Sequence, residues 1–192
     1  MDTATGTGAA AIAPAQYAND EDLLAEVLRV YRADCRYLKS AVITDTESGL
    51  VTGTCEFSIP APFYIEDTGH FNAVEFNLCY NQMMYYAVAK SVKEGLMKPF
   101  GDWTPDEYRE RQLADFLIVD FKSSFRQGVR SHHFYGEIAF ARLHTTVGGR
   151  NWRPMIIADT TCRYWDDFGG HCAGEVRLAV TNPPARTAGG DR

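Results

Sequence analysis

The sequence lacks any apolar run approaching the ~20 residues that a membrane-spanning helix needs, and it lacks a basic excess, since its formal net charge is −6. The acidic balance argues against nucleic acid as the main partner. No basic segment precedes an apolar core near the N-terminus, so residues 1–18, rich in Ala, Thr and Gly, do not resemble a signal peptide. We therefore expect a cytoplasmic protein without a membrane or nucleic-acid partner, with disordered tails at residues 1–18 and 183–192.

Closely spaced cysteine pairs and nucleophile motifs are also missing. The five cysteines are odd in number, and no C-x-x-C pair occurs. Most lie in apolar segments, which favours buried free thiols over a disulfide framework or a zinc site. No G-x-S-x-G elbow and no catalytic cysteine motif is present. We therefore predict no metal, no cofactor and non-covalent catalysis. The cysteines are Cys35, Cys55, Cys79, Cys162 and Cys172.

The hydrophobic pattern predicts a single domain over residues 19–182. Asn19 or Asp20 caps a first helix, whose apolar residues recur at helical spacing. A second helix runs from about residue 72 to residue 93, and Thr104 opens a short third helix. The first two strand-like runs form a hairpin, and the last four form a meander. These runs are residues 35–43, 50–59, 113–125, 133–146, 152–165 and 172–180.

The long helix predicts the fold class. Its segment 76–92 is too continuously apolar for a surface helix, so most of its circumference is buried. An antiparallel sheet can bury one helix against its concave face. We therefore predict an α+β hot-dog fold, an antiparallel sheet wrapped around one long central helix. Six strands leave exposed edges, and hot-dog domains commonly pair at such edges, so by that analogy we expect a homo-oligomer, a dimer or a higher assembly.

The junction before the long helix is the strongest candidate for a site. Asn72 and Glu75 have the spacing of a helix N-cap and its N3 partner, and His70 follows a flexible turn at Gly69. The start of a buried helix offers backbone N–H groups and a positive dipole end, which suit a developing oxyanion. His70 would serve as general acid or base, or else is an inert turn residue. Asn72 and Glu75 are capping residues first, although Asn72 could position a substrate carbonyl and Glu75 could be a base.

Other polar side chains are weaker candidates for contacts with a substrate. Asn81 lies within the apolar helix on the face opposite Asn72, so it serves either a partner chain's site or an anchor to the sheet. Tyr31 and Tyr64 flank the junction, where core packing is the usual alternative. Arg126, at a strand end, is a reasonable contact for a carboxylate or phosphate.

The sequence resembles the FcoT-like hot-dog proteins. The resemblance rests on the stretch Tyr64-Ile65 and Thr68-Gly69-His70-Phe71-Asn72-Ala73-Val74-Glu75, followed by Asn81-Gln82, and covers about residues 20–183. Cys35-Arg36-Tyr37-Leu38, Trp103 with Tyr108, Gln112-Leu113, Phe125-Arg126, Trp152-Arg153, Trp165-Asp166, Gly169-Gly170 and Gly174-Glu175 complete the pattern. By this resemblance, His70 matches the motif histidine, and further family site positions match Tyr31, Tyr64, Asn72 and Asn81.

The family resemblance implies chemistry on acyl thioesters. The family was named for fatty acyl-CoA thioesterases, and members in clusters for isonitrile lipopeptides and β-amino acids look like enzymes that add glycine to a 2-enoyl-acyl-carrier-protein. Hydrolysis of the thioester then releases a 3-(carboxymethylamino) fatty acid. Such an enzyme needs a cation for the glycine carboxylate, for which Arg126 or Lys90 are candidates. The implied partners are glycine and an acyl carrier protein or a CoA ester.

Three functions remain open from the sequence. Glycine addition is the preferred one, a plain acyl-CoA or acyl-carrier-protein thioesterase is the second, and a non-catalytic acyl-binding module is the third. Because carrier proteins are acidic, we expect a locally basic docking face. Its candidate residues are Lys90, Lys93, Lys98, Lys122, Arg126 and Arg130.

Overall fold

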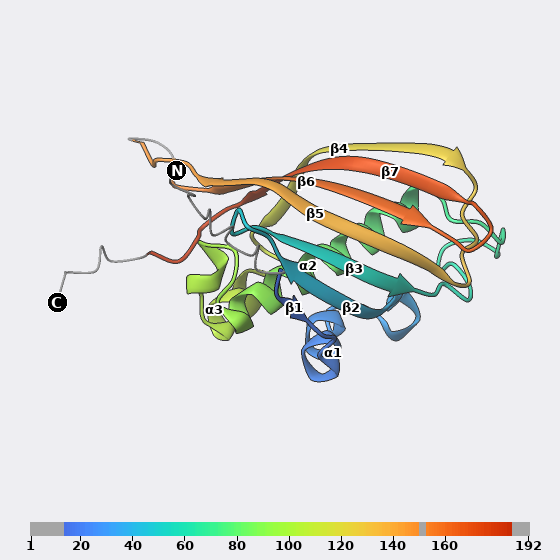
Figure 1. Ribbon diagram of the computed structural model, residues 1–192, viewed down its shortest axis with the longest axis horizontal. Coiled ribbons are helices and arrows are strands. Elements are labelled where there is room, and N and C mark those ends of the chain that lie inside the picture. Colours follow the sequence, from blue (N-terminus) through green and yellow to red (C-terminus); the bar gives the residue numbers. More distant parts are fainter. Residues whose placement is uncertain (1–13, 150–152, 186–192) are drawn as a thin grey trace, which may run out of the picture.

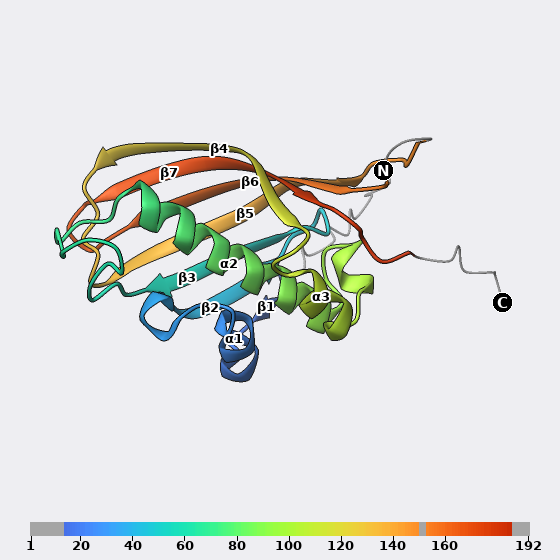
Figure 2. The same cartoon turned by 180° about the vertical axis from the view of Figure 1, so that it is seen from behind.

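The computed structural model describes residues 14–149 and 153–185, and in these residues a seven-stranded antiparallel sheet curls around one long helix (Figure 1). The helix, α2 (Ala73–Glu94), lies along the concave face of the sheet, as the reverse view in Figure 2 shows. This arrangement confirms the predicted α+β hot-dog fold. The strands are β1 (Gln16–Tyr17), β2 (Leu38–Asp45), β3 (Val51–Phe57), β4 (Phe116–Gln127), β5 (Phe134–Thr145), β6 (Ile156–Trp165) and β7 (His171–Val180).

Local signals fix both ends of α2. Asn72 is the N-cap, and it forms the predicted capping box with Glu75. The helix stops at Gly95, which takes the left-handed conformation with φ of 71° that glycine adopts without strain. Between these ends most side chains are buried, because α2 has the sheet on one side and α1 on another. In the described part of the chain, no helix is both long and apolar enough to cross a membrane.

The strand order corrects one prediction. The four C-terminal strands do not form a simple meander, because β5, β6 and β7 are consecutive neighbours but β4 pairs with β7 at the sheet edge. The segment between β4 and β5 instead crosses the end of the sheet, where backbone hydrogen bonds hold it. Phe71 N donates to Val129 O at 2.8 Å, and Ile59 N donates to Ser131 O at 2.9 Å. The crossing lets β5 pair with β3.

The N-terminal end also differs from the expectation. Gln16 and Tyr17 form β1, which pairs with Ile43 and Thr44 of β2, although the predicted tail extended to residue 18. The sheet therefore gains a seventh strand that the two-residue run did not indicate. Residues 1–13, 150–152 and 186–192 lie outside the described residues, so the start of the run predicted at 152–165 is not described, and β6 begins at Ile156.

Short helices cover the remaining edges of α2. α1 (Glu21–Leu28) begins after the predicted cap Asp20, whose side chain accepts Leu23 N at 3.1 Å. α3 (Pro105–Arg111) begins after Thr104, which forms a second capping box with Glu107. Two 3₁₀ turns, η1 (Ala33–Cys35) and η2 (Phe100–Asp102), complete the elements.

One buried amide ties α2 to the segment that enters β2. Gln82 is fully buried, and its Oε1 accepts the backbone N–H groups of Tyr37 and Leu38, both at 2.9 Å. Its Nε2 donates to Cys35 O at 2.6 Å. All of these groups would be costly to bury unpaired. Gln82, rather than its neighbour Asn81, is therefore a polar anchor between α2 and the segment that enters β2.

Candidate active site

Three predicted site residues, Tyr64, Asn72 and Glu75, meet in one hydrogen-bonded cluster at the start of α2. The Tyr64 hydroxyl donates to Glu75 Oε1 at 2.7 Å, and Asn72 Nδ2 donates to the same hydroxyl oxygen at 2.7 Å. The other carboxylate oxygen, Glu75 Oε2, accepts the backbone N–H of Asn72 at 3.0 Å. Glu75 is only 1% exposed, whereas Tyr64 is 37% exposed. The cluster thus connects a buried acid to the surface through one phenol.

Electrostatics favour a protonated phenol at Tyr64. Burial and the hydrogen bond to Glu75 raise the pKa of Tyr64, so its hydroxyl remains a donor at neutral pH. Exposed apolar side chains accompany the cluster in sequence, namely Phe63, Ile65 and Val74, and the Phe63 ring packs edge-on to Tyr64 at a centroid distance of 5.1 Å. The cluster therefore opens onto an apolar surface, which suits an acyl or pantetheine chain more than a charged ligand.

The capping box uses the backbone N–H groups that were expected to face an oxyanion. Asn72 Oδ1 accepts Val74 N at 2.8 Å and also the N–H of Glu75, while Asn72 N is bound to Glu75. The helix start is therefore largely satisfied by its own side chains. The amide of Asn72 carries two N–H groups and only one of them is needed by Tyr64. Side-chain donors, rather than the backbone of α2, are the groups at this end that can polarise a carbonyl.

Tyr37 lies near the same acid and was not among the residues predicted for the site. It is 1% exposed, and its hydroxyl is buried without a well-formed hydrogen bond among the described residues, the Phe63 backbone being the nearest polar partner. Burial raises the pKa of Tyr37 to about 12, with Cys35, Cys79 and Glu75 adding to the effect and the Phe63 backbone opposing it. The only signal for it in the sequence was its place in the run 35–38 that resembles the family.

Tyr31 and Cys79 are, like Tyr64 and Tyr37, groups whose protonated form is favoured. Burial raises the pKa of Tyr31, and the nearby Tyr85 and Cys79 add to the shift. Burial also raises the pKa of Cys79 well above its usual value. Because a thiol must ionise to act as a nucleophile, Cys79 is an inert thiol at neutral pH. All five cysteines are free and buried, as predicted.

His70 lies at the rim rather than in the cluster. Its side chain is exposed, its Nδ1 lies 3.1 Å from Thr68 O in its own turn, and its backbone forms a bridge with Arg130. Among the described residues no hydrogen bond joins His70 to Glu75 or Tyr64. The next residue, Phe71, is buried against Phe134 and Tyr164, which anchors the turn. The acid–base role of His70 therefore stays a prediction.

Asn81 also lies apart from the cluster. Its Nδ2 donates to Asn77 Oδ1 at 3.0 Å, one turn earlier on α2, and both side chains are half-buried. Asn81 does not bond to the sheet, so the anchoring alternative belongs to Gln82 instead. Its predicted service to a partner chain's site remains a prediction.

Comparisons with known proteins show the family of this chain. The model of the FcoT-like thioesterase domain matches residues 26–180. The chain belongs to the FcoT-like thioesterase family. A (2E)-enoyl-[ACP] glycyltransferase of Streptomyces coeruleorubidus is 50% identical over 165 residues, which cover 86% of this chain and 99% of that protein. The protein of the same name from Mycobacterium tuberculosis is 37% identical, over 85% of this chain and 88% of its own length.

A solved structure of a thioesterase family protein from Silicibacter pomeroyi is similar with a TM-score of 0.44. It is 15% identical and covers 83% of this chain and 97% of its own.

Two predicted cations lie elsewhere in this FcoT-like chain. Lys90 is 6% exposed and forms ion pairs with Asp20 at 3.7 Å and Glu94 at 3.0 Å. It lies 15 residues after Glu75 on α2, which is roughly 22 Å along the helix axis. Its charge is therefore already paired at the other end of the helix from the Tyr64–Glu75 cluster, and its assignment to the glycine carboxylate stays a prediction.

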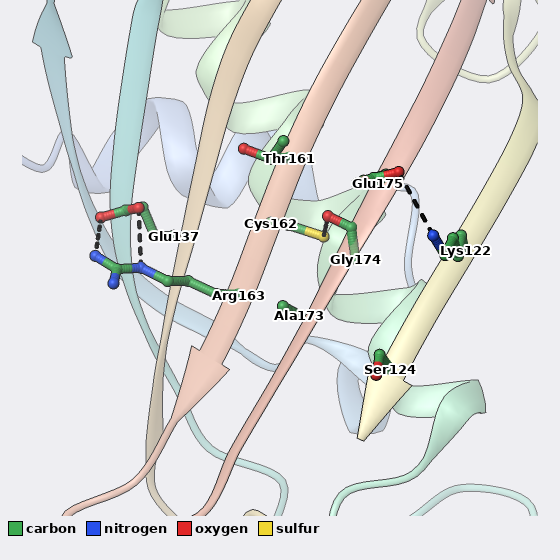
Figure 3. A pocket seen from close by; sticks show the side chains of 9 residues that line it. All are labelled: Lys122, Ser124, Glu137, Thr161, Cys162, Arg163, Ala173, Gly174 and Glu175. Carbon is green, nitrogen blue, oxygen red and sulfur yellow. Dashed lines mark hydrogen bonds and ion pairs between the residues drawn. The ribbon is translucent and has the colours of Figure 1, made fainter. Parts of the chain in front are cut away.

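Arg126 lies near the end of β4. It lines a hollow together with Ser124, Arg163, Tyr164, Cys172 and Ala173. An adjoining hollow of about 340 Å³, shown in Figure 3, is lined by Lys122 and by the Arg163–Glu137 pair. No hydrogen bond among the described residues joins Arg126 to the cluster, and its predicted contact with the glycine carboxylate stays a prediction.

The predicted basic docking face is split between the two ends of the FcoT-like domain. Lys93 bonds to Asp20 and Lys98 pairs with Asp102 at 2.9 Å, both toward the C-terminal end of α2. Arg130 lies beside His70, with its guanidinium 3.5 Å from the centroid of the Phe168 ring. Of these three residues, Arg130 is the one near the Tyr64–Glu75 cluster. In residues 14–149 and 153–185, no group of three or more His, Cys, Asp or Glu is arranged to hold a metal.

Proposed function

We propose that this chain adds glycine to a 2-enoyl thioester carried on an acyl carrier protein and then hydrolyses the thioester, releasing a 3-(carboxymethylamino) fatty acid. The observation that carries the proposal is the 50% identity, over 86% of this chain, to a protein named (2E)-enoyl-[ACP] glycyltransferase. The buried Glu75 with its Tyr64 and Asn72 partners supplies the acid–base and polarising groups that the reaction needs. Formation of a precursor for isonitrile or β-amino-acid products belongs to the same proposal.

The addition step follows from the charges that develop. The amine of glycine attacks C3 of the enoyl group, the C2–C3 π electrons move toward C1, and an enolate forms on the thioester oxygen. The second N–H of Asn72 Nδ2 would stabilise this oxygen, and so would the Tyr64 hydroxyl once it turns from Glu75 to the substrate. Glu75 accepts the proton that the amine loses and returns it to C2, which gives the saturated thioester and restores the carboxylate for the next step.

Hydrolysis uses the same groups on a second intermediate. Water attacks C1, its proton passes to Glu75, and the negative charge again collects on the former carbonyl oxygen. Collapse of this tetrahedral intermediate breaks the C–S bond, and the thiol leaves with a proton. The role of His70 is to relay protons between this buried acid and solvent, because it lies at the exposed rim.

A plain thioesterase is the second candidate, and it is favoured by the family to which the chain belongs. The two functions differ only in the nucleophile, so mass spectrometry of a crotonyl-loaded carrier protein, incubated with and without glycine, separates them. A released acid heavier than crotonate by one glycine supports the proposal. Release of unmodified crotonate at equal rates in both samples supports the thioesterase. No turnover with carrier or CoA thioesters would favour the acyl-binding module.

We further propose that the active form is a homo-oligomer. Strand β4 is bonded to β7 on one side only and exposes Leu117 and Val119, at 46% and 55%. Such an apolar edge strand is a template for pairing with another chain. The predicted service of Asn81 to a partner chain's site belongs to the same proposal. A cytoplasmic location stays a prediction from the sequence.

A further inference from the structure

A second cavity lies at the far end of the molecule from the Tyr64–Glu75 cluster. It has a volume of about 750 Å³ and lies between the end of β5, the start of β6 and residues 182–185. Its wall is mainly apolar, with Trp103, Ile156 and prolines such as Pro99 contributing. Arg111 and Arg153 also line it, and no acidic side chain of the described residues does. The cavity therefore combines an apolar body with a positive rim.

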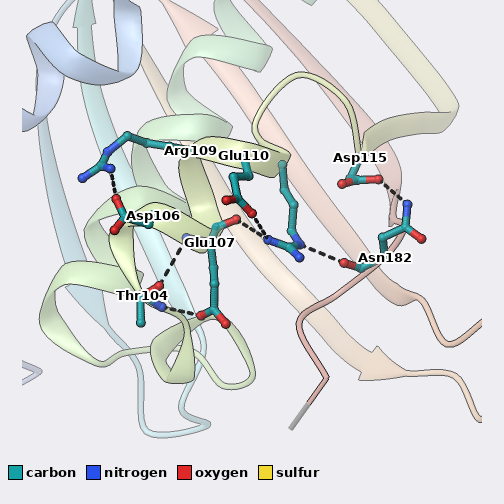
Figure 4. Close-up of polar contacts among 8 residues, drawn as sticks. Thr104, Asp106, Glu107, Arg109, Glu110, Asp115 and Asn182 are labelled. Atoms are coloured by element: carbon teal, nitrogen blue, oxygen red, sulfur yellow. Dashed lines mark hydrogen bonds and ion pairs between the residues drawn. The ribbon is translucent and has the colours of Figure 1, made fainter.

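Asn182 holds both guanidinium groups in place. Arg111 Nε donates to Asn182 O at 2.8 Å, and Arg153 Nη1 donates to Asn182 Oδ1 at 3.1 Å. Asn182 takes a left-handed conformation with φ of 47°, and its Nδ2 donates to Asp115 Oδ1 at 2.8 Å, as Figure 4 shows. Few residues other than Asn and Gly accept this backbone geometry. One asparagine thus orients two cations from distant segments, α3 and the start of the β6 region.

Both arginines keep donors for a ligand. A guanidinium has five N–H groups. Arg111 uses its Nε for Asn182, and its Nη1 contacts both Glu107 O at 2.8 Å and the Glu110 carboxylate at 3.4 Å. In the described residues no hydrogen bond engages Nη2 of Arg111, nor Nε or Nη2 of Arg153. Arg111 also lies 6.0 Å from the centroid of the Trp103 ring, which borders the same cavity. The cations are therefore pre-oriented but not saturated.

We propose that this cavity is a binding site for an amphiphilic carboxylate, such as a free fatty acid. The two oxygens of a carboxylate match the fork of a guanidinium, and an aliphatic chain would lie against Trp103, Ile156 and Pro99. A nucleotide would instead bring several charges and a polar base to a wall that is mainly apolar. The site is remote from the Tyr64–Glu75 cluster, so this proposal does not depend on the proposed function.

Calorimetric titration of the full chain with sodium decanoate tests the proposal. We expect saturable binding to the wild type and about tenfold weaker binding to Arg153→Gln, because a charge-assisted hydrogen bond is lost. Asn182→Ala should also weaken binding, since it removes the Oδ1 that holds Arg153. The matched control is Arg177→Gln, which removes an exposed guanidinium paired with Asp159 on the outer face of the sheet and should leave binding unchanged.

Several outcomes would overturn the assignment. Decanoate could also enter the acyl site, but that component would be equal in the wild type and in Arg153→Gln, so equal total binding refutes the second site. Absence of binding to the wild type refutes it as well. Displacement of decanoate by 1-decanol at equal concentration would show that the arginines take no part. Displacement by inorganic phosphate would make the site one for phosphates instead of carboxylates. Arg153 lies away from the Tyr64–Glu75 cluster, so Arg153→Gln should retain turnover of enoyl thioesters. The titration measures binding and not turnover, so it tests this cavity even if the proposed reaction fails.

Discussion

Replacing Glu75 by Gln tests the assignment of the buried acid most directly. The side chain keeps its size and one carbonyl oxygen, but it loses the negative charge that accepts the Tyr64 hydroxyl at 2.7 Å and Asn72 N at 3.0 Å. The new amide NH₂ group must face one of these two donors. The variant therefore removes the proton acceptor and one of these two hydrogen bonds, while it leaves the apolar contacts of α2 intact.

The two effects differ in size. Loss of a capping interaction lowers the free energy of unfolding by about 1 kcal/mol, which leaves most of the chain folded. Loss of a general base lowers the turnover number by about 10²- to 10⁴-fold. Because the catalytic effect exceeds what partial unfolding could produce, activity and stability measurements can separate the two roles of Glu75.

The assay is the glycine-dependent consumption of a crotonyl-loaded carrier protein, followed by mass spectrometry, together with denaturant unfolding. Glu107→Gln is a matched control, because Glu107 is the N3 residue of the second capping box, and its Oε2 accepts Thr104 N at 2.7 Å (Figure 4). We expect both variants to lose similar stability and only Glu75→Gln to lose turnover. If Glu75→Gln retained turnover within about threefold of the wild type, well below the effect expected for a base, the acid–base argument would be wrong.

Three further predictions concern the same network and the core. Tyr64→Phe should lower turnover by about 10²-fold without unfolding the chain, because it removes one donor to the oxyanion. Steady-state kinetics measures the loss of turnover, and circular dichroism checks that the variant is folded. Gln82→Leu should destabilise the chain by about 3 kcal/mol, since it leaves two N–H groups and one carbonyl buried without partners, which urea unfolding measures. The hydrogen bond from Lys93 lowers the pKa of Asp20, so its stabilisation is present above about pH 4 and lost as pH falls through the lower native pKa; unfolding at several pH values should show a smaller acid step in Asp20→Asn.

Features with local causes could be predicted from the sequence, and the strand order could not. The start of α2 depends on Asn72 and Glu75, three residues apart, and its end depends on Gly95, so a single stretch of chain contains the information. An alternating run such as the one that forms β4 identifies a strand but not its neighbours. The place of β4 beside β7 depends on the crossing segment, where Arg130 N donates to Asp166 Oδ2 at 2.7 Å. That contact joins residues 36 positions apart, and no periodicity encodes it.

The same distinction explains the candidate site. Tyr64, Asn72 and Glu75 lie within one short stretch and meet in the structure. Lys90, in contrast, is paired with Asp20, which lies 70 positions earlier in the chain. The residues around Lys90 in the sequence do not indicate this pairing. The capping box links the two levels of organisation. It fixes where α2 begins, and by the same hydrogen bonds it holds the buried carboxylate next to the Tyr64 hydroxyl. The structural and catalytic interpretations of Glu75 are therefore not alternatives, because the bond that starts the helix also positions the acid.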